Sequence, residues 1–320
     1  MTLPIIEDDP LPSELYHYTD AGGLKGILEG KQLWATHAAY LNDSEEILYG
    51  RNAILSEIKK LGKERPPEIK DAWTANSNWL LKLFGTPTLM AGLTAMIQQR
   101  TAALLDNFGP FVTCLSESRD QLSQWRGYGG GGGYAIRFDP AGLHESVVRL
   151  STPLPQPLPG MGPNEVPIGA RRFIKMEYDT DGQYEFLRQQ LIDFIHRSVK
   201  YFEDYKDDSE AKKAQAAQLG QETMGWLHGL MMHLKNPGFA EEKEYRILTF
   251  FPPDFFSPTD TGLVPRVNIR FDPCCIKEIV IGPGRSMETR EASVRYFLNV
   301  HNTDYPGVEV TPSKTPFRGN

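Results

Sequence analysis

The stretch that most constrains the fold is Leu15–Glu46, where strand-like and helix-like segments follow one another with almost no loop between them. It opens with the aromatic-rich run LYHYT, which is typical of a strand. Thr19 or Asp20 then stands where a helix N-cap is expected, ahead of apolar residues at helical spacing, and Gly30 is expected to end that helix. His17 leaves the strand just before this helix N-terminus, which is a good position for holding an anionic or polar group.

The rest of the chain predicts strands and helices in an irregular order. Strands are predicted over 32–36, 111–115, 134–138, 171–178, 242–251, 264–271, 276–281 and 308–310, and helices over 45–61, 71–84, 89–108, 184–204, 209–234 and 287–300. Ser44 and Ser286 are expected to cap the first and last of these helices, and 116–128 is predicted as a short helix or turn. A parallel doubly wound fold would alternate more regularly. We therefore expect an α+β protein: a single domain over residues 15–320 with a split or antiparallel mixed sheet and helical insertions near 45–108 and 184–234.

Three segments are expected to lie outside regular elements. Residues 1–14, with three prolines, are predicted as a flexible arm, and residues 151–167, with six prolines, as a long surface loop. Gly129–Gly133 is followed by a strand, not by a helix, and lacks the GK[ST] ending of a phosphate loop. A flexible hairpin connection is its plain interpretation, and a mobile flap beside a ligand is the alternative.

The composition is that of an ordinary globular domain, with 40% hydrophobic and 23% charged residues. The net charge of -7 gives no global basic field for nucleic acid, although it leaves room for a local basic groove. No apolar run approaches the roughly 18–20 residues of a membrane span, and the N-terminus lacks signal-peptide features. The three cysteines form no disulfide framework. We expect a cytoplasmic protein with no membrane contact.

Metal binding is not expected. Cys274 and Cys275 are adjacent and have no C-x-x-C partner, and the five-residue spacing of His228 and His233 does not align them on a helix face. A nucleophilic pair of Cys114 with a histidine is a minor alternative.

The segment EKEYR, Glu242–Arg246, is a sharper candidate. If a strand begins at Glu242, then Glu242, Glu244 and Arg246 share one face. A charged sheet edge in solvent is the plain structural interpretation. Two carboxylates on one face are also a way to stabilise a positive charge that develops during a reaction.

These blocks carry a resemblance. The opening resembles that of the bacterial domain-of-unknown-function family 2971 (DUF2971), with its pattern YHYT…GIL…G.LWA…LNDSEE, and the similarity continues in CLSESRDQLSQWRG, in residues 134–138 and in EKEYR. That family in turn resembles, more distantly, the ADP-ribosyltransferases, including DNA-modifying toxins with a YH.T…ILE.G.L opening. The resemblance implies an ADP-ribosyltransferase-like fold and NAD as substrate, without a metal.

The resemblance also implies roles for residues. Glu244 would hydrogen-bond the 2′-hydroxyl of the nicotinamide ribose, and Glu242 would assist the acceptor or orient its neighbour. Breaking the nicotinamide–ribose bond develops positive charge on the sugar, which a nearby carboxylate stabilises. His17 would hold the adenosine ribose. The other implied cofactor-binding residues are Tyr18, Thr19, Asn42, Ser116, Trp125, Arg126, Tyr134 and Arg246.

Of these residues, Tyr18 or Tyr134 would stack on nicotinamide; either Arg126 or, outside this set, Arg137 would meet the pyrophosphate. Trp125 also has a plain interpretation as a core anchor, and Asn42 as part of a turn. The sequence departs from the histidine-type enzymes because their pair of spaced tyrosines has no clear counterpart. Ser116 and Ser118 resemble a serine motif of the other branch.

The sequence thus predicts an NAD-dependent ADP-ribosyltransferase-like enzyme, a candidate toxin or defence effector, whose macromolecular acceptor is a protein or a nucleic acid. The alternatives are an NAD glycohydrolase and a non-catalytic module that binds a nucleotide or a protein. The enzyme interpretation requires His17, Tyr134 and Glu244 to converge in one cleft.

Overall fold

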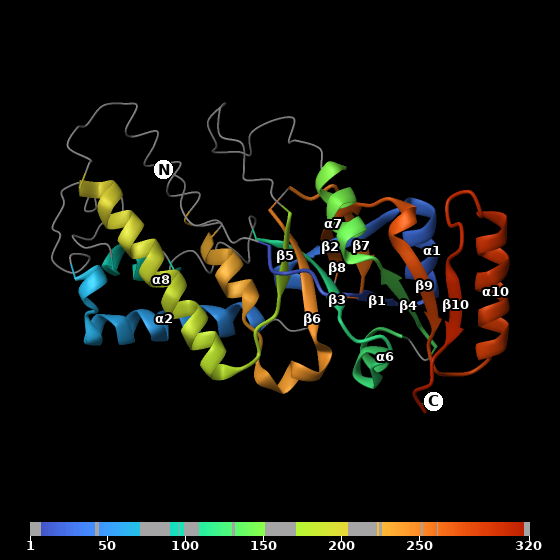
Figure 1. Ribbon diagram of the computed structural model, residues 1–320, viewed down its shortest axis with the longest axis horizontal. Helices are drawn as coiled ribbons and strands as arrows, with labels where there is room; N and C mark the ends of the chain where they lie inside the picture. Colours follow the sequence, from blue (N-terminus) through green and yellow to red (C-terminus); the bar gives the residue numbers. More distant parts are fainter. Residues whose placement is uncertain are drawn as a thin grey trace.

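The computed structural model describes residues 8–41, 45–70, 90–95, 97–98, 109–129, 132–150, 171–203, 223, 226–250, 252–260 and 262–316. Within these residues, ten strands form one sheet, with α2 (Glu46–Glu64) and α8 (Thr180–Glu203) at one end of the molecule and α10 (Met287–Val300) at the other (Figure 1). The predicted α+β class is confirmed.

Neighbouring strands of the sheet pair almost entirely in antiparallel fashion. They are β1 (Leu15–Thr19), β2 (Gln32–His37), β3 (Phe111–Ser116), β4 (Tyr134–Phe138), β5 (Arg172–Lys175), β6 (Glu244–Thr249), β7 (Phe255–Thr259), β8 (Gly262–Arg270), β9 (Ile276–Ile281) and β10 (Glu309–Pro312). Their order is β10-β9-β4-β1-β3-β2-β8-β7, with β6 on β3 and β5 on β6. Among the described strand pairs, β9 and β10 are parallel and the others are antiparallel.

The sheet divides into two branches at β3. One edge of β3 pairs with β6 from Phe111 to Ser116. On the other edge, β2 pairs with Phe111 and Val112, whereas β1 pairs with Ser116. The described strands β1 and β2 therefore diverge along the middle of β3, around Cys114, and they leave a gap in the ladder there.

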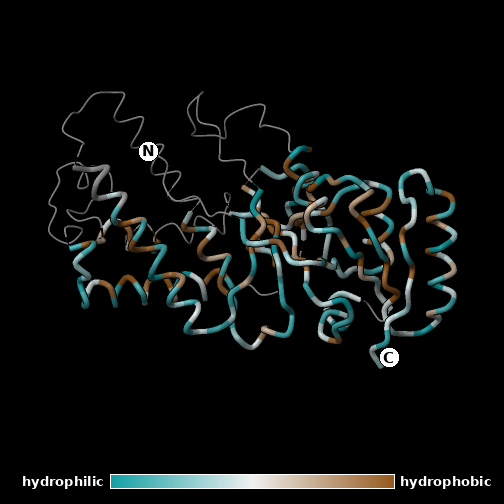
Figure 2. Tube along the Cα trace, viewed as in Figure 1, coloured by the Kyte–Doolittle hydropathy of each residue, from teal (hydrophilic) through white to brown (hydrophobic). Residues whose placement is uncertain are grey.

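The remaining helices cover the two faces of the sheet. Among the described residues these are α1 (Ala21–Gly30), α6 (Leu122–Tyr128), α7 (Pro140–Arg149), a helical stretch over 90–95 and a helix over residues 226–233. A first core lies between α2, α8, this last helix and the sheet, and a second core lies on the opposite face beneath α1, α7 and α10. A third cluster packs Trp125 of α6 on Tyr16 and Tyr18. Hydrophobic residues recur along α2 and α8, as their burial requires (Figure 2).

Two predicted helix bounds are confirmed, but their caps differ from expectation. Helix α1 ends at Gly30 as predicted, and Lys31 after it takes the left-handed conformation, with φ 52°. Ser286 adopts φ 55° and makes no side-chain cap bond to α10. The sequence also failed to predict α7, which starts at a proline, and β7, an edge strand that contains Pro258.

The correction that matters most concerns Glu242. The strand β6 begins at Glu244, and Glu242 ends a 3-10 helix, Pro237–Glu242. Lys243 lies between them with φ 44°, so the chain turns and the alternation of a strand does not extend back to Glu242. Several predicted features lie outside the described residues. They are the helix 71–84, the loop 151–167, Ser44, Gly130, Gly131 and most of 89–108 and 209–225.

The described part of the N-terminal arm is bound to the sheet. The backbone N–H groups of Phe173 and Lys175 on β5 donate to the carboxylates of Asp8 and Asp9, each at 2.7 Å. The Asp9 N–H donates to the Phe173 carbonyl at 2.8 Å. These bonds cover part of an otherwise open strand edge. Across the described parts of the chain, none of the helices has the length and apolar character that crossing a membrane would take.

Candidate functional site

His17 and Glu244 reach the same residue, Cys114, from the two sides of β3. The imidazole Nδ1 of His17 lies 3.0 Å from the Cys114 carbonyl oxygen, and the Cys114 thiol donates a hydrogen bond to the Glu244 carboxylate. Because a carbonyl only accepts, the proton of the neutral His17 ring is on Nδ1 and Nε2 carries a lone pair. The imidazole thus supplies a donor where β1 has separated from β3.

By strand register, His17 and Tyr134 share one face of the sheet and Glu244 lies on the other, so the three residues expected in one cleft do not share a face. Tyr16, Ser116 and Glu244 are register partners and share a face, so His17 leaves β1 on the opposite face. Tyr134 lies one strand beyond β1, paired with Thr19, and its ring packs under the guanidinium of Arg290 at 5.8 Å. The structure therefore brings His17 and Glu244 to Cys114 but places Tyr134 away from it.

Glu244 lies at the centre of a buried ion-pair cluster. Its side chain is 4% exposed, and its Oε1 accepts from Arg246 Nε at 2.6 Å. Its Oε2 accepts from Arg246 Nη2 at 3.1 Å and from Lys235 Nζ at 2.5 Å. This fork-like contact fixes the orientation of the carboxylate.

Arg246 extends the cluster into the first core. Its guanidinium also donates to Glu46 of α2 and, at 3.2 Å, to the Met232 carbonyl. The Arg246 side chain is 1% exposed, so its donors are used within the protein. It therefore acts here as the partner of two carboxylates, whereas the sequence had predicted a cofactor contact.

Lys235 joins the cluster to the surface. Its ammonium group lies 2.5 Å from a carboxylate oxygen of Glu242 and 2.5 Å from one of Glu244. The Glu242 side chain is 20% exposed, and that of Lys235 is 8% exposed. We call Glu46, Arg246, Glu244, Lys235 and Glu242 the acid–base chain; its three carboxylates and two cations leave one formal negative charge.

The pKa values follow from this arrangement. Burial alone would raise the pKa of Glu244, but the charges of Arg246 and Lys235 lower it to about 2. Burial raises the pKa of Glu46 despite Arg246, because Glu244 adds a second negative charge nearby. Burial, together with Glu244, raises the pKa of Cys114 well above its ordinary value. A thiol held in its neutral form argues against the nucleophilic-cysteine alternative.

Two tyrosines and a serine lie around Glu244 and Glu242, at the outer end of the acid–base chain. Tyr178 accepts the Glu244 backbone N–H at 2.9 Å through its hydroxyl oxygen, and Tyr128 of α6 is 40% exposed. Burial and the nearby negative charge raise the pKa of both phenols. Ser116 Oγ donates to the Glu242 carbonyl at 2.7 Å and accepts from Ser118 N–H at 3.0 Å. Among the predicted residues, Ser116 is thus placed to hold the segment that carries Glu242.

Other predicted site residues fill the core under α6. The Tyr18 hydroxyl donates to the Ser118 carbonyl at 2.6 Å, and the Tyr18 ring meets Trp125 edge-on at 4.7 Å. Both side chains are buried, so the plain interpretation of Trp125 as a core anchor describes its position. Arg126 is exposed on α6, whereas Asn42 lies outside the described residues.

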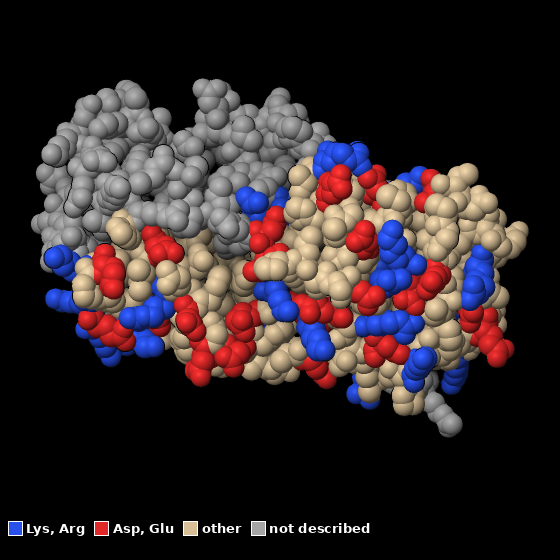
Figure 3. All heavy atoms as spheres, in the orientation of Figure 1, with Lys and Arg blue, Asp and Glu red and all other residues tan. Residues whose placement is uncertain are grey.

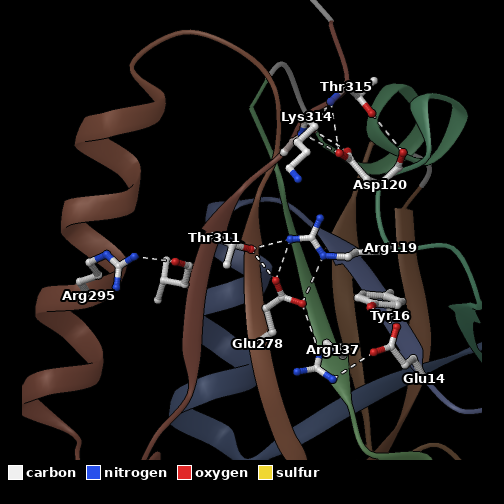
Figure 4. Close-up of polar contacts among 12 residues, drawn as sticks. Glu14, Tyr16, Arg119, Asp120, Arg137, Glu278, Arg295, Thr311, Lys314 and Thr315 are labelled. Atoms are coloured by element: carbon white, nitrogen blue, oxygen red, sulfur yellow. Dashed lines mark hydrogen bonds and ion pairs between the residues drawn. The ribbon is translucent and has the colours of Figure 1, made fainter.

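Asp120 ties α6 to the C-terminal segment, as Figure 4 shows. Its carboxylate accepts from Trp125 Nε1 at 2.7 Å, from Ser313 Oγ at 2.5 Å and from the backbone N–H groups of Lys314 and Thr315 at 2.7 and 3.2 Å. These four bonds satisfy the carboxylate and lower its pKa although burial opposes this. The C-terminal segment therefore helps to position the helix that carries Tyr128.

Arg137, which the resemblance offered for a pyrophosphate, is already paired. It lies 3.1 Å from Glu14 and 3.2 Å from Glu278, and Glu278 also binds Arg119 at 2.7 Å (Figure 4). In the described residues, no group of three or more His, Cys, Asp or Glu side chains is arranged to hold a metal ion.

Sequence reasoning missed two members of the acid–base chain. Lys235 directly follows the predicted helix 209–234, and Glu46 lies in the first turn of the predicted helix 45–61; neither was given a role in the site. Arg246 and Glu46 are 200 residues apart, so local patterns carried no signal of their contact. A buried lysine beside two carboxylates leaves its trace only in the tertiary structure.

Part of the chain that carries this site matches a known protein family. Residues 124–247 match DUF2971, a protein of unknown function. The resemblance to DUF2971 is confirmed over this part of the chain, which includes α6, β4, Lys235 and the EKEYR segment; the opening block with His17 precedes it. Comparison with curated proteins and with solved structures found no match. The more distant resemblance to ADP-ribosyltransferases stays a prediction.

Proposed function

We propose that this protein cleaves the nicotinamide–ribose bond of NAD and transfers ADP-ribose to an acceptor or to water. The observation that carries the proposal is the place of the Lys235 ammonium group, 2.5 Å from both Glu242 and Glu244. Because the Lys235 ammonium already lies between the two carboxylates, the support comes from the one negative charge left over in the acid–base chain, with Glu242 at its exposed end, which suits a reaction in which positive charge develops on a sugar. This excess negative charge of the acid–base chain stabilises the positive charge that develops on the ribose.

The two carboxylates divide the work according to their exposure. Glu244 is fixed by Arg246, as a preorganised electrostatic group should be, while Glu242 is the one that an incoming ribose reaches first. In the proposed reaction the C1′–N bond breaks, and nicotinamide leaves as a neutral molecule with the bonding electrons. The acceptor oxygen or nitrogen then bonds to C1′ and gives its proton to Glu242.

A binding module of the same fold is the second candidate. The observation in its favour is that both oxygens of Glu244 are already used by Arg246 and Lys235. In that case the acid–base chain only holds β6 against α2. The two candidates differ in whether nicotinamide is released.

The test measures nicotinamide release and NAD affinity for the full chain and three variants. Glu242→Gln keeps the shape of the side chain but removes its charge, so turnover should fall by about 10²–10³-fold with little change in NAD affinity. His17→Ala should weaken NAD binding instead. Glu288→Gln, on the first turn of α10, is the matched control and should behave as wild type.

The outcomes separate the two candidates. NAD binding without nicotinamide release by the wild type would support the binding module. Release that is unchanged in Glu242→Gln would remove this carboxylate from the mechanism. Neither NAD binding nor nicotinamide release would overturn the enzyme and also a module that binds NAD.

A further inference from the structure

The β2–β8 part of the sheet presents a row of polar, basic and aromatic side chains on one face. In the register of these antiparallel strands, Gln32 is opposite Arg270, Trp34 opposite Asn268 and Thr36 opposite Arg266, so all six side chains share a face. Between them along the strands lie the buried residues of the second core. We call these six residues the β2–β8 face.

Trp34 is the centre of this face. Its side chain is 47% exposed, and its ring meets that of Phe255 on β7 edge-on at 5.1 Å. Because Trp34 is opposite Asn268, its diagonal neighbours on β8 are Arg266 and Arg270, at the roughly 7–8 Å typical of such positions. On this face the exposed ring of Trp34 therefore lies between the positions of two arginines.

Among the described residues, neither Arg266 nor Arg270 forms an ion pair with a carboxylate. Arg266 donates to the hydroxyls of Ser257, at 2.9 Å, and of Thr36, and burial lowers its pKa. Arg270 is exposed. Arg171 lies close by: burial lowers its pKa, and so does the charge of Arg270, although Asp254 opposes both effects. Arg171 thus adds a third guanidinium near this face, and Asp254 is the acidic residue whose charge acts on it.

We propose that the β2–β8 face binds single-stranded nucleic acid. A base stacks on the exposed ring of Trp34, and the backbone phosphates on either side of that base meet Arg266 and Arg270. Asn268 lies opposite Trp34, but its side-chain oxygen is buried, so the proposed contacts are those of Trp34 and the two arginines.

This local arrangement resolves an apparent conflict with the net charge of -7. On the face drawn in Figure 3, acidic and basic side chains are interspersed. A mixed surface and an acidic total do not prevent a small basic site, because charges farther than about 10 Å are largely screened at ordinary salt. The proposal is independent of the NAD chemistry, since the β2–β8 face uses none of the residues of the acid–base chain.

The test is fluorescence anisotropy of the full chain with labelled oligo-dT and oligo-U, at low and at physiological salt. Trp34→Ala should weaken binding by about 5–150-fold, the loss expected when one stacking contact of about 1–3 kcal/mol is removed. Arg270→Gln should weaken binding and lower the slope of log affinity against log salt by about 0.7, the value for one phosphate contact on a single strand. Arg270 is exposed, so this variant is expected to fold even where Arg266→Gln does not.

Two matched controls lie on another part of the surface. Tyr296→Ala removes a ring that is 73% exposed on α10, and Arg285→Gln removes an exposed charge. Both should bind as wild type. Stronger binding of one oligonucleotide than the other would distinguish RNA from DNA within the proposal. The proposal would be overturned if the wild type did not bind at low salt, or if variants and controls lost affinity equally. It would also be overturned if an acidic peptide competed for binding and an unlabelled oligonucleotide did not.

Discussion

Lys235 Nζ lies 2.5 Å from Glu244 Oε2, within a part of the structure that is almost closed to solvent. The second carboxylate that this ammonium group contacts, Glu242, belongs to a 3-10 helix and not to the strand. Lys235 therefore joins the start of β6 to the turn before it, and the two glutamates share this cation, while Glu244 also pairs with Arg246.

Replacing this cation should cost much stability. Lys235→Met keeps a long unbranched side chain but leaves Glu244 with Arg246 as its remaining cation, so the free energy of unfolding should fall by roughly 3–5 kcal/mol. Lys59→Met, at an exposed position of α2, should change it little. Denaturant unfolding of both variants checks this, and equal effects would contradict a buried ion pair at Lys235.

Acid should weaken the fold through Glu244. The pKa of this carboxyl is about 2 in the folded protein and near its ordinary value when unfolded, so it contributes stability above about pH 4.5. That contribution should be lost as the pH falls toward 2. In Glu244→Gln, which is less stable at neutral pH, this part of the acid dependence should disappear. The free energy of unfolding of the wild type and of Glu244→Gln, measured across this pH range, shows whether the two proteins become equally stable in acid.

Two glycine-to-alanine changes should have opposite signs. A Cβ on Gly50 of α2 would lie 2.4 Å from the Met231 carbonyl oxygen, so Gly50→Ala should force the two helices apart and cost about 1–3 kcal/mol. On Gly26 of α1 a Cβ meets nothing within 4 Å, and alanine should stabilise the helix by about 0.5–1 kcal/mol. Thermal unfolding measures both shifts. A stable Gly50→Ala variant would mean that α2 does not pack this closely.

Asp120→Ala should release the C-terminal segment and loosen α6. The change removes the acceptor for Trp125, Ser313, Lys314 and Thr315, so amide hydrogen exchange should speed up over 313–316 and in α6. Asp260→Ala, in the exposed turn between β7 and β8, is the control and should leave both segments protected. Faster exchange in the C-terminal segment alone would show that α6 is held by other contacts.

Local sequence patterns predicted many of the elements correctly. The aromatic run at Leu15 forms β1, Asp20 caps α1 through its carboxylate, and the apolar period after Tyr184 belongs to the long helix α8. These features depend on side-chain periodicity and on helix caps. Both are set by residues only a few positions apart, so a single segment of sequence is enough to predict them. Where the backbone turns unexpectedly, as at Lys243, the same patterns misplaced the start of a strand.

The site, in contrast, was decided by contacts between distant segments. The sequence offered Glu242 and Glu244 as a pair on one strand face, but the structure places them on different elements and joins them through Lys235. It also brings Glu46 to Arg246 across 200 residues and His17 to Cys114 across 97. Burial makes each charge depend on partners that only the folded chain brings within reach, because a charge without a partner is too costly in a low-dielectric interior. Sequence alone therefore determined which residues could ionise, and the tertiary structure determined which of them are paired.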